Sequence, residues 1–481
     1  MQIASWIAAA VALRLGLLML LPSPLLSYIQ DPQRYELVTP LTSHRRLLEG
    51  LHLMEQGASP YSGDLVHHAP LVLSLVQSVS KQLKVGPVAQ VSAAITATAT
   101  SMAPETQHVR WAVILLTLVS DVLAGLALAG VARYSVRWLD GSRLKNNQNK
   151  PEASAATSSL FAVTEKDADD AAQTTLLVWL FNPFSILCFL AHSTASWDAF
   201  LIASALYFAV KQHSALAALF CVLAGYSSLY PIALVAPLAL AIASHPPVLQ
   251  LHSAPSSALA AVNSVQAPSD VSTWRVVVFG FWVVAWTLVV ALASYLYIDS
   301  WDFVDAVFGF IIQVPDLTPN IGLMWYFFTE IFMHFRPFFA WVFQLHVFIY
   351  VFPLSVQFRR HPPLLAFAIV TIITVFKSYP SMGDLALVFS MLCMFPQLNP
   401  YLRFRFVVGG ILTFTTILGP VFFHQWLVGS NGNANFPYGV TLAHAFAVTA
   451  LALDYCLAYL RREYDIIHGI AVPDGATVVM Q

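Results

Sequence analysis

Apolar stretches long enough to cross a lipid bilayer recur along the whole chain, and polar clusters that break helices separate them. About 20 apolar residues span the hydrocarbon core, and shorter segments cross when other helices surround them. By this rule the sequence predicts about twelve spans. They lie near residues 3–22, 109–131, 172–191, 195–211, 213–229, 230–244, 276–298, 337–358, 362–377, 382–398, 404–427 and 437–460. The expected fold is an all-α polytopic membrane protein, with residues 1–481 as a single membrane domain.

The composition agrees with a membrane protein and excludes several other classes. Of the 481 residues, 58% are hydrophobic and 10% are charged, and the mean hydropathy is +0.69. The formal net charge of -2 offers no basic surface for nucleic acid. Cys188, Cys221, Cys393 and Cys456 all lie in apolar runs, which predicts buried thiols and no disulfide framework. The histidines lack the spacing of a metal site, so we assign no metal and no cofactor.

The distribution of Lys and Arg predicts the orientation. Short basic loops mark the cytoplasmic side of a membrane protein. With the N-terminus in the cytoplasm, the loops after spans two, four, eight and ten and the C-terminal tail are basic and cytoplasmic. The opposite side then receives the clusters at Asn182-Pro183, Tyr230-Pro231, residues 316–320 and residues 377–384. Both termini are therefore predicted to be cytoplasmic. The first span is expected to be a retained anchor, because Arg14 interrupts its apolar stretch and no basic residue precedes it.

The segments between spans fall into two kinds. Residues 23–108 form a loop opposite the cytoplasm, in which leucines at helical spacing predict an amphipathic helix ending at Gly57 and the stretch 69–79 predicts a second interfacial helix. Residues 299–336 are expected to be a re-entrant or interfacial segment on the same side. Residues 141–170 and 245–273 have no apolar face and are predicted to be mobile cytoplasmic loops, and residues 461–481 a cytoplasmic tail.

Long irregular blocks follow one another in order from the first span to the tail. They are 39–50 (TPLTSHRRLLEG), 57–63 (GASPYSG), 300–303 (SWDF), 314–322 (VPDLTPNIG) with 325–328 (WYFF), 376–380 (FKSYP) with 383–384 (GD), and 460–464 (LRREY) with 468–469 (HG). Together they resemble the family of class U subunits (PIG-U) of the glycosylphosphatidylinositol (GPI) transamidase. The resemblance implies a non-catalytic, multi-pass subunit in the endoplasmic reticulum membrane that recognises or presents the GPI lipid. Its partners would be the other transamidase subunits, including the caspase-like catalytic subunit, and we assign no catalytic residue here.

A weaker resemblance points to the GPI mannosyltransferases and the glycosyltransferase C architecture. It rests on the GASPY motif after the amphipathic helix, on Pro70-Leu71 and on Asn182-Pro183. Those enzymes carry an acidic pair just before the interfacial helix, and the offset from Gly57 places it near Leu41 and Ser43, which are not acidic. The resemblance therefore implies a glycosyltransferase C-like bundle that has lost its acids.

An enzyme that uses a polyprenyl-phosphate sugar is the alternative function. Asp31, Asp302 or Asp316 would then supply the carboxylate. A transporter or scramblase is a more distant third possibility.

Lys377 and Asp384 are the sharpest candidates for a site. A charge at the end of an apolar helix must pair, reach water or meet a ligand. One interpretation is a salt bridge across a tight turn. The other is that Lys377 faces a phosphate of the GPI core, while Asp384 orients the lysine or meets an ethanolamine amine.

Aromatic residues follow a second polar cluster, at residues 316–320. Asn320 or Thr318 is expected to cap the next helix, and the aromatic run to lie at headgroup depth along the path of the lipid. The candidates for GPI binding are Lys377, Asp384, Tyr379, Asp316, Asn320, Trp325, Tyr326, Phe327 and Phe328. The candidates for a structural or docking role are Asn182, Pro183, Tyr230 and Asn399.

Overall fold

The computed structural model describes residues 2–31, 34–85, 104–139, 163–244 and 272–468. Within these ranges the chain forms helices and turns and no β-strand, which confirms the predicted all-α class. The first half contains α1 (Gln2–Leu20), α2 (Ser23–Ile29), α3 (His44–Glu55), α4 (Pro70–Val85), α6 (Pro104–Trp138), α8 (Glu165–Leu180), α9 (Pro183–Leu190), α10 (Ala195–Val210), α11 (Ser214–Ser228), η2 (Tyr230–Leu234) and α12 (Val235–Ala243). The second half contains α14 (Thr273–Ile298), η4 (Val304–Gly309), α15 (Phe310–Gln313), α16 (Met324–Glu330), α17 (Arg336–Ile349), α18 (Val351–Gln357), α19 (Pro362–Phe376), α20 (Met382–Leu392), η5 (Pro396–Tyr401), α21 (Arg405–Leu427) and α22 (Asn435–His468).

Seven helical segments among the described residues have the length and composition to cross a membrane. They are Ile3–Leu20, His108–Val136, Glu165–Leu190, Thr273–Ile298, Arg336–Gln357, Arg405–Leu427 and Asn435–Ile466. Six further apolar helices of 10–17 residues accompany them, and five of these coincide with the shorter predicted spans. The sixth, Val304–Gln313, lies in the segment predicted to be re-entrant. The count of twelve stays a prediction, because a helix shorter than about 17 residues does not by itself cross the hydrocarbon core.

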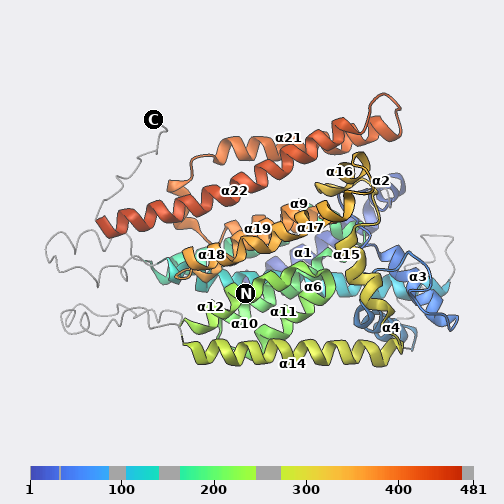
Figure 1. Ribbon diagram of the computed structural model, residues 1–481, viewed down its shortest axis with the longest axis horizontal. Coiled ribbons are helices and arrows are strands. Elements are labelled where there is room, and N and C mark those ends of the chain that lie inside the picture. Colours follow the sequence, from blue (N-terminus) through green and yellow to red (C-terminus); the bar gives the residue numbers. More distant parts are fainter. Residues whose placement is uncertain (1, 32–33, 86–103, 140–162, 245–271, 469–481) are drawn as a thin grey trace.

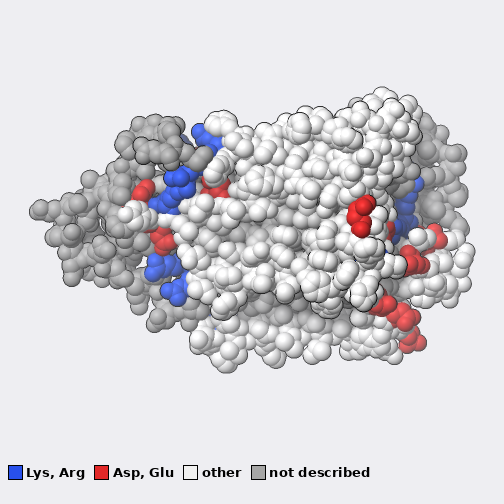
Figure 2. All heavy atoms as spheres, turned by 45° about the horizontal axis from the view of Figure 1, so that its top comes forward, with Lys and Arg blue, Asp and Glu red and all other residues white. Residues whose placement is uncertain are grey.

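The long helices lie roughly along the longest axis of the molecule (Figure 1). The hairpin of α21 and α22 lies along one edge and α14 along the opposite edge, while α2, α3, α4 and α16 gather at one end. On the face drawn in Figure 2, charged residues gather toward the two ends and leave a broad uncharged band between them. A band of this kind is what a lipid bilayer requires of the surface it covers.

The core of the bundle surrounds α19. Nearly every residue of α19 from Pro362 to Val375 is buried, although the helix has only 15 residues. By contrast, α14 exposes large apolar side chains along its length, including Phe281 and Leu288. The short apolar helices therefore lie inside the bundle, and the long helices α14 and α21 present apolar side chains on its outside.

A fully buried ion pair holds α1 to the bundle. Nε of Arg14 lies 2.7 Å from Oδ2 of Asp121 on α6, and both side chains are 1% exposed. Another nitrogen of the same guanidinium donates to the backbone carbonyl of Leu180 at 2.7 Å, and a third donates to Oγ of Ser185 at 3.1 Å. The residue that interrupts the first apolar stretch is thus a contact that joins α1, α6, α8 and α9.

The Asn182-Pro183 break accounts for the carbonyl that Arg14 contacts. Proline has no N–H, so the Trp179 carbonyl lacks the donor four residues on and accepts from the Asn182 N–H at 3.4 Å and from Oγ of Ser185 at 3.1 Å. The Phe184 N–H turns to Oδ1 of Asn182, which leaves the Leu180 carbonyl for Arg14. The break lies inside the candidate span Glu165–Leu190, whereas the sequence predicts it at the end of a span.

The predicted cytoplasmic loop 141–170 is partly helical. Residues 165–170 belong to α8, which begins at a capping box between Thr164 and Asp167. The prediction missed this turn because its apolar face consists only of alanines, of which Ala168 is buried with Val136 of α6. Residues 140–162 and 245–271 lie outside the described residues, and the tail is helical as far as His468.

The two helices predicted in the loop 23–108 are present as α3 and α4. The chain reaches Gly57 after α3, where φ is +75°, a value that favours glycine. The apolar face of α3 does not lie free against the membrane, because Leu47 and Leu51 pack with Leu73 of α4 and Val113 of α6. These two helices form a small second core at one end of the bundle.

Candidate functional site

Residues 377–384 form a turn, which we call the 377–384 turn, between the buried helices α19 and α20. Lys377 ends α19 as its C-cap residue, and Pro380 cannot continue a helix. α20 begins after Ser381, whose N–H and Oγ donate to Oδ2 of Asp384 at 2.8 and 3.2 Å. Gly383 lets the turn approach α10, because a Cβ atom at this position would lie 2.7 Å from that of Ala195. The polar and small residues of this block therefore have local structural reasons to be where they are.

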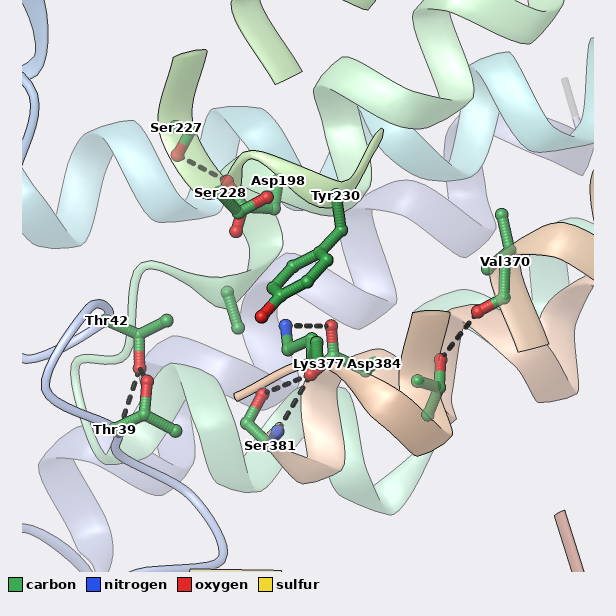
Figure 3. Close-up of polar contacts among 12 residues, drawn as sticks. Thr39, Thr42, Asp198, Ser227, Ser228, Tyr230, Val370, Lys377, Ser381 and Asp384 are labelled. Atoms are coloured by element: carbon green, nitrogen blue, oxygen red, sulfur yellow. Dashed lines mark hydrogen bonds and ion pairs between the residues drawn. The ribbon is translucent and has the colours of Figure 1, made fainter. Parts of the chain in front are cut away.

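The two charged candidates of the turn contact each other. Nζ of Lys377 lies 2.7 Å from Oδ1 of Asp384, and the side chains are 9% and 19% exposed. Figure 3 shows the pair below the ring of Tyr230, with Asp198 and its partner Ser227 on the far side of that ring. The salt-bridge interpretation is thus the one seen in this structure, and each partner keeps a small exposed surface.

Tyr230 fixes the turn to the rest of the bundle. Its hydroxyl lies 2.6 Å from Oγ of Ser378, accepts from the Ser378 N–H at 3.0 Å and donates to Oε1 of Gln344 at 2.9 Å. Oγ of Ser378 in turn donates to the Ile311 carbonyl at 2.8 Å. Tyr230 begins η2, so its place as a structural residue between α11 and α12 follows from this hydrogen-bond network.

The segment 314–322 folds onto the same turn. The hydroxyl of Tyr379 donates to the Asp316 carbonyl at 3.1 Å, and a Cβ atom on Gly322 would lie 2.8 Å from Cδ of Pro380. Asn320 is buried and its Oδ1 accepts from the Gly322 N–H at 2.7 Å. Asn320 and Thr318 therefore shape the loop and do not cap α16, whose N-cap residue is Leu323, so that prediction is wrong.

Asp316 joins the turn region to α3. Its Oδ2 lies 2.9 Å from a guanidinium nitrogen of Arg46, and its Oδ1 accepts from the Thr318 N–H at 2.9 Å. Burial by itself would raise the pKa of Asp316, but the hydrogen bonds from Thr318 and the Arg46 charge outweigh burial and hold the pKa below its usual range. The carboxylate is therefore ionised and paired at neutral pH.

The aromatic run divides between two neighbours. Trp325 and Phe328 are each 3% exposed. Trp325 stacks on Trp426 near the end of α21, whereas Phe328 packs edge-on against Phe343 of α17. Tyr326 is half-buried and hydrogen-bonds to Asn435. Only Tyr326 and Phe327 keep substantial exposed surface, so in this structure Trp325 and Phe328 hold the run in place and do not line an open path.

The remaining candidates lie elsewhere. Asn182 caps α9 within the bundle, and Asn399 is exposed in η5, beyond the end of α20. A cavity of about 560 Å³ borders Asn399, Gln397 and Asp170. The structure therefore brings together the candidates of residues 316–328 and 377–384 with Tyr230, and it separates Asn182, Pro183 and Asn399 from them.

Sequence reasoning missed two residues that organise the site. Gln344 is buried within a candidate span and bonds to Tyr230, Ser378 and the Ile311 carbonyl. A polar residue inside an apolar span was the signal that could have identified it. Arg46 lies on the polar face of the predicted amphipathic helix, and nothing in the sequence connects it to Asp316.

The four cysteines are free thiols. Cys188 and Cys221 are buried, as predicted, whereas Cys393 and Cys456 are half-buried. Within the described ranges no group of three or more His, Cys, Asp or Glu side chains could hold a metal ion. The chemistry available at the 377–384 turn is that of an ammonium, a carboxylate and hydroxyl groups, which suits binding of a charged, hydrogen-bonding ligand.

The fold and this turn define a polytopic, all-helical membrane protein with a polar turn built into the end of an apolar bundle. Residues 8–444 match the family described as GPI transamidase subunit PIG-U. Since the match covers most of the chain, the chain belongs to this family of GPI transamidase subunits.

Similar proteins agree with this assignment along nearly the whole length. The chain is 33% identical to the GPI-anchor transamidase component PIGU of Cricetulus griseus, with 93% of each chain covered. Its identity to the component of the same name from Homo sapiens is 32%, again with 93% of each covered. The GPI transamidase component GAB1 of Saccharomyces cerevisiae is 27% identical, over 95% of this chain and 94% of the relative. The family resemblance predicted from the sequence is confirmed.

Proposed function

We propose that this chain is a non-catalytic subunit of the GPI transamidase that recognises the GPI lipid or presents it to the caspase-like catalytic subunit. The complex would act in the endoplasmic reticulum membrane, with both termini of the chain in the cytoplasm. The observation that carries the proposal is the Lys377–Asp384 ion pair at the joined ends of two apolar helices. The capping box of α20 accounts for Asp384 but not for Lys377, and burying a charged pair costs free energy that a hydrophobic pair would not.

The lipid supplies groups that match this pair. A GPI core carries phosphates and an ethanolamine amine, and an ammonium suits a phosphate while a carboxylate suits an amine. Opening the 2.7 Å contact would expose both partners to one ligand. Tyr326 and Phe327 are only partly buried; they lie in α16, just after the segment 314–322 that folds onto the turn, and would contact apolar or sugar parts of the lipid.

Copurification of endogenous GPI with the tagged chain tests the proposal. Lys377→Met keeps the apolar stem of the lysine and removes its charge. Asp384→Asn keeps an oxygen that can accept from Ser381 and frees Lys377 from its partner. If Lys377 binds a phosphate, Lys377→Met loses the lipid but keeps the partner subunits, while Asp384→Asn retains the lipid or binds it more tightly.

The exposed pair Arg360–Glu463 provides a matched control. Its nitrogen and oxygen are 3.2 Å apart, in a contact between the start of α19 and the end of α22. Arg360→Gln and Glu463→Gln should change neither lipid nor partners, because exposed pairs contribute little. Equal lipid retention by wild type and Lys377→Met would refute the recognition role. Transfer of a sugar by the purified chain alone would favour the polyprenyl-phosphate-sugar-dependent glycosyltransferase instead.

A further inference from the structure

A second cluster of polar side chains lies apart from the 377–384 turn, where α2 ends and α3 begins. Gln30 is at its centre, and we call the set Gln30, His44, Arg45, Arg110 and His192 the Gln30 cluster. Oε1 of Gln30 accepts from a guanidinium nitrogen of Arg110 at 3.3 Å, and its backbone carbonyl accepts from Arg45 at 3.4 Å. Nε2 of Gln30 lies 3.3 Å from Nε2 of His192. Gln30 therefore connects α3 through its backbone carbonyl with α6, His192 and the Leu190 carbonyl through its side-chain amide.

The two arginines of the cluster are poorly satisfied. A guanidinium carries five N–H donors, but Arg45 and Arg110 each donate to a single oxygen of the neutral residue Gln30, at 3.4 and 3.3 Å. Among the described residues, no ion pair joins Arg45 or Arg110 to a carboxylate, whereas the neighbouring Arg46 has Asp316. The cluster thus holds two positive charges without a negative partner in the described part of the chain.

A buried ring nitrogen of His192 independently indicates that this cluster binds a ligand. Its side chain is 2% exposed, and its Nδ1 is buried without a hydrogen-bond partner. The ring lies 5.0 Å from the ring of His44, centroid to centroid. An unpartnered buried nitrogen is unfavourable, and a bound acceptor or donor would satisfy it.

The start of α3 adds to the positive potential. The first residues of the helix are His44, Arg45 and Arg46, and no acidic residue lies in the first turn. Helix N-termini favour negative charge, because their first N–H groups lack helical partners and the helix dipole is positive there. Basic residues at this position are unfavourable, because their charge has the same sign as this end of the helix dipole, unless an anion binds there. A helix start with this sequence has the electrostatic pattern of an anion site.

Burial and the neighbouring charges keep both histidines neutral. Burial, with Arg110 and Arg45, lowers the pKa of His44 to about 4. Burial, with His44 and Arg110, lowers the pKa of His192 well below its usual value. In the neutral form each imidazole has one donor and one acceptor nitrogen, so each ring can still donate one hydrogen bond to an anion.

We propose that the Gln30 cluster is a binding site for a phosphate group, formed by Arg45, Arg110, the two imidazoles and the N-terminus of α3. Phosphate fits better than a carboxylate, because it has three or four oxygens for donors that approach from α3, α6 and the loop before α10. The phosphate can belong to a membrane phospholipid headgroup or to a phosphodiester carried on a glycan. The inference does not depend on GPI recognition at the 377–384 turn.

Binding of defined probes by the full-length chain in nanodiscs tests the site. One arm titrates soluble phosphoethanolamine into phosphatidylcholine nanodiscs, with acetate at the same ionic strength as the carboxylate comparison. The other arm adds phosphatidic acid to the nanodiscs and measures retained lipid. Arg45→Gln is the first variant, because Arg45 is exposed and its loss does not threaten folding. Arg110→Gln is the second, and Arg133→Gln, near the other end of the same helix α6, is the matched control.

We expect saturable binding in at least one arm, weakened by roughly tenfold or more in Arg45→Gln and in Arg110→Gln, and unchanged in Arg133→Gln. Arginine-dependent binding of phosphoethanolamine assigns a glycan-borne phosphate, and binding of phosphatidic acid alone assigns a lipid headgroup. Wild-type affinity in both arginine variants overturns the site. So does equal weakening in Arg133→Gln, equal binding of acetate, or no binding in either arm.

Discussion

Removal of the Arg14 charge should destabilise the bundle more than the loss of any surface ion pair. Arg14 and Asp121 are each 1% exposed, so Arg14→Met leaves a carboxylate uncompensated inside apolar surroundings. Breaking one partner of a buried pair costs about 3–5 kcal/mol. The Leu180 carbonyl also loses its donor, at a further cost of about 1–3 kcal/mol. Since such contributions overlap, we expect a loss of about 3–6 kcal/mol in the free energy of unfolding.

The double variant separates charge from packing. Arg14→Met with Asp121→Leu removes both charges, so it should recover most of the ionic cost and retain only the cost of the unpaired carbonyl. The assay is reversible unfolding of the purified chain in mixed micelles, monitored by tryptophan fluorescence. Arg133→Met is the control, because the contact of Arg133 with Asp169 is exposed and worth at most about 1 kcal/mol. A double variant no more stable than Arg14→Met would refute the ionic argument.

Three further predictions concern the turn and the end of the bundle. Gly383→Val should destabilise the chain by about 1–3 kcal/mol through the clash with Ala195, whereas Gly409→Val, in open space, should not; equal melting temperatures would contradict this. Tyr230→Phe should cost about 1–3 kcal/mol, because the Ser378 N–H loses its acceptor and Oε1 of Gln344 loses its donor. Tyr350→Phe should be neutral, as thermal unfolding in detergent would report. Burial, with His67 and Arg46, lowers the pKa of His68 to about 3, so the unfolded chain binds this proton first and stability falls as the pH drops from about 6.5 toward 3. The melting temperature should therefore fall less between pH 7.5 and 5.5 in His68→Leu than in wild type or His52→Leu, and identical slopes would count against the reasoning.

Helix limits could be predicted where the residue types themselves end a helix. Pro380 with Ser381 and Gly383 stops α19 and starts α20, and Gly57 follows α3, because these residues act through local backbone geometry. The same local rules do not show whether a helix break lies at the end of a membrane span or inside it. Asn182-Pro183 looks like the end of a span in the sequence, and only the contact with Arg14 shows how a break inside the span is satisfied.

Pairings between distant segments were beyond sequence reasoning. Arg14 meets Asp121, and Arg46 meets Asp316, across more than a hundred positions in each case. A charge inside an apolar stretch of the sequence needs a partner, but the sequence does not show which residue that partner is. The aromatic run illustrates the same limit. Trp325 and Phe328 are buried by side chains of α21 and α17, and the sequence does not show that these helices come to lie against them.

The Arg14–Asp121 contact sets a condition on how the newly made chain enters the membrane. α1 leaves the ribosome before α6 and α8, and an arginine near the middle of an isolated span opposes insertion by about 2.5–3.5 kcal/mol. Its partner Asp121 and the Leu180 carbonyl are synthesised much later. Stable integration of α1 should therefore wait for α6 and α8, so these three segments become membrane-embedded as one cooperative unit during translation.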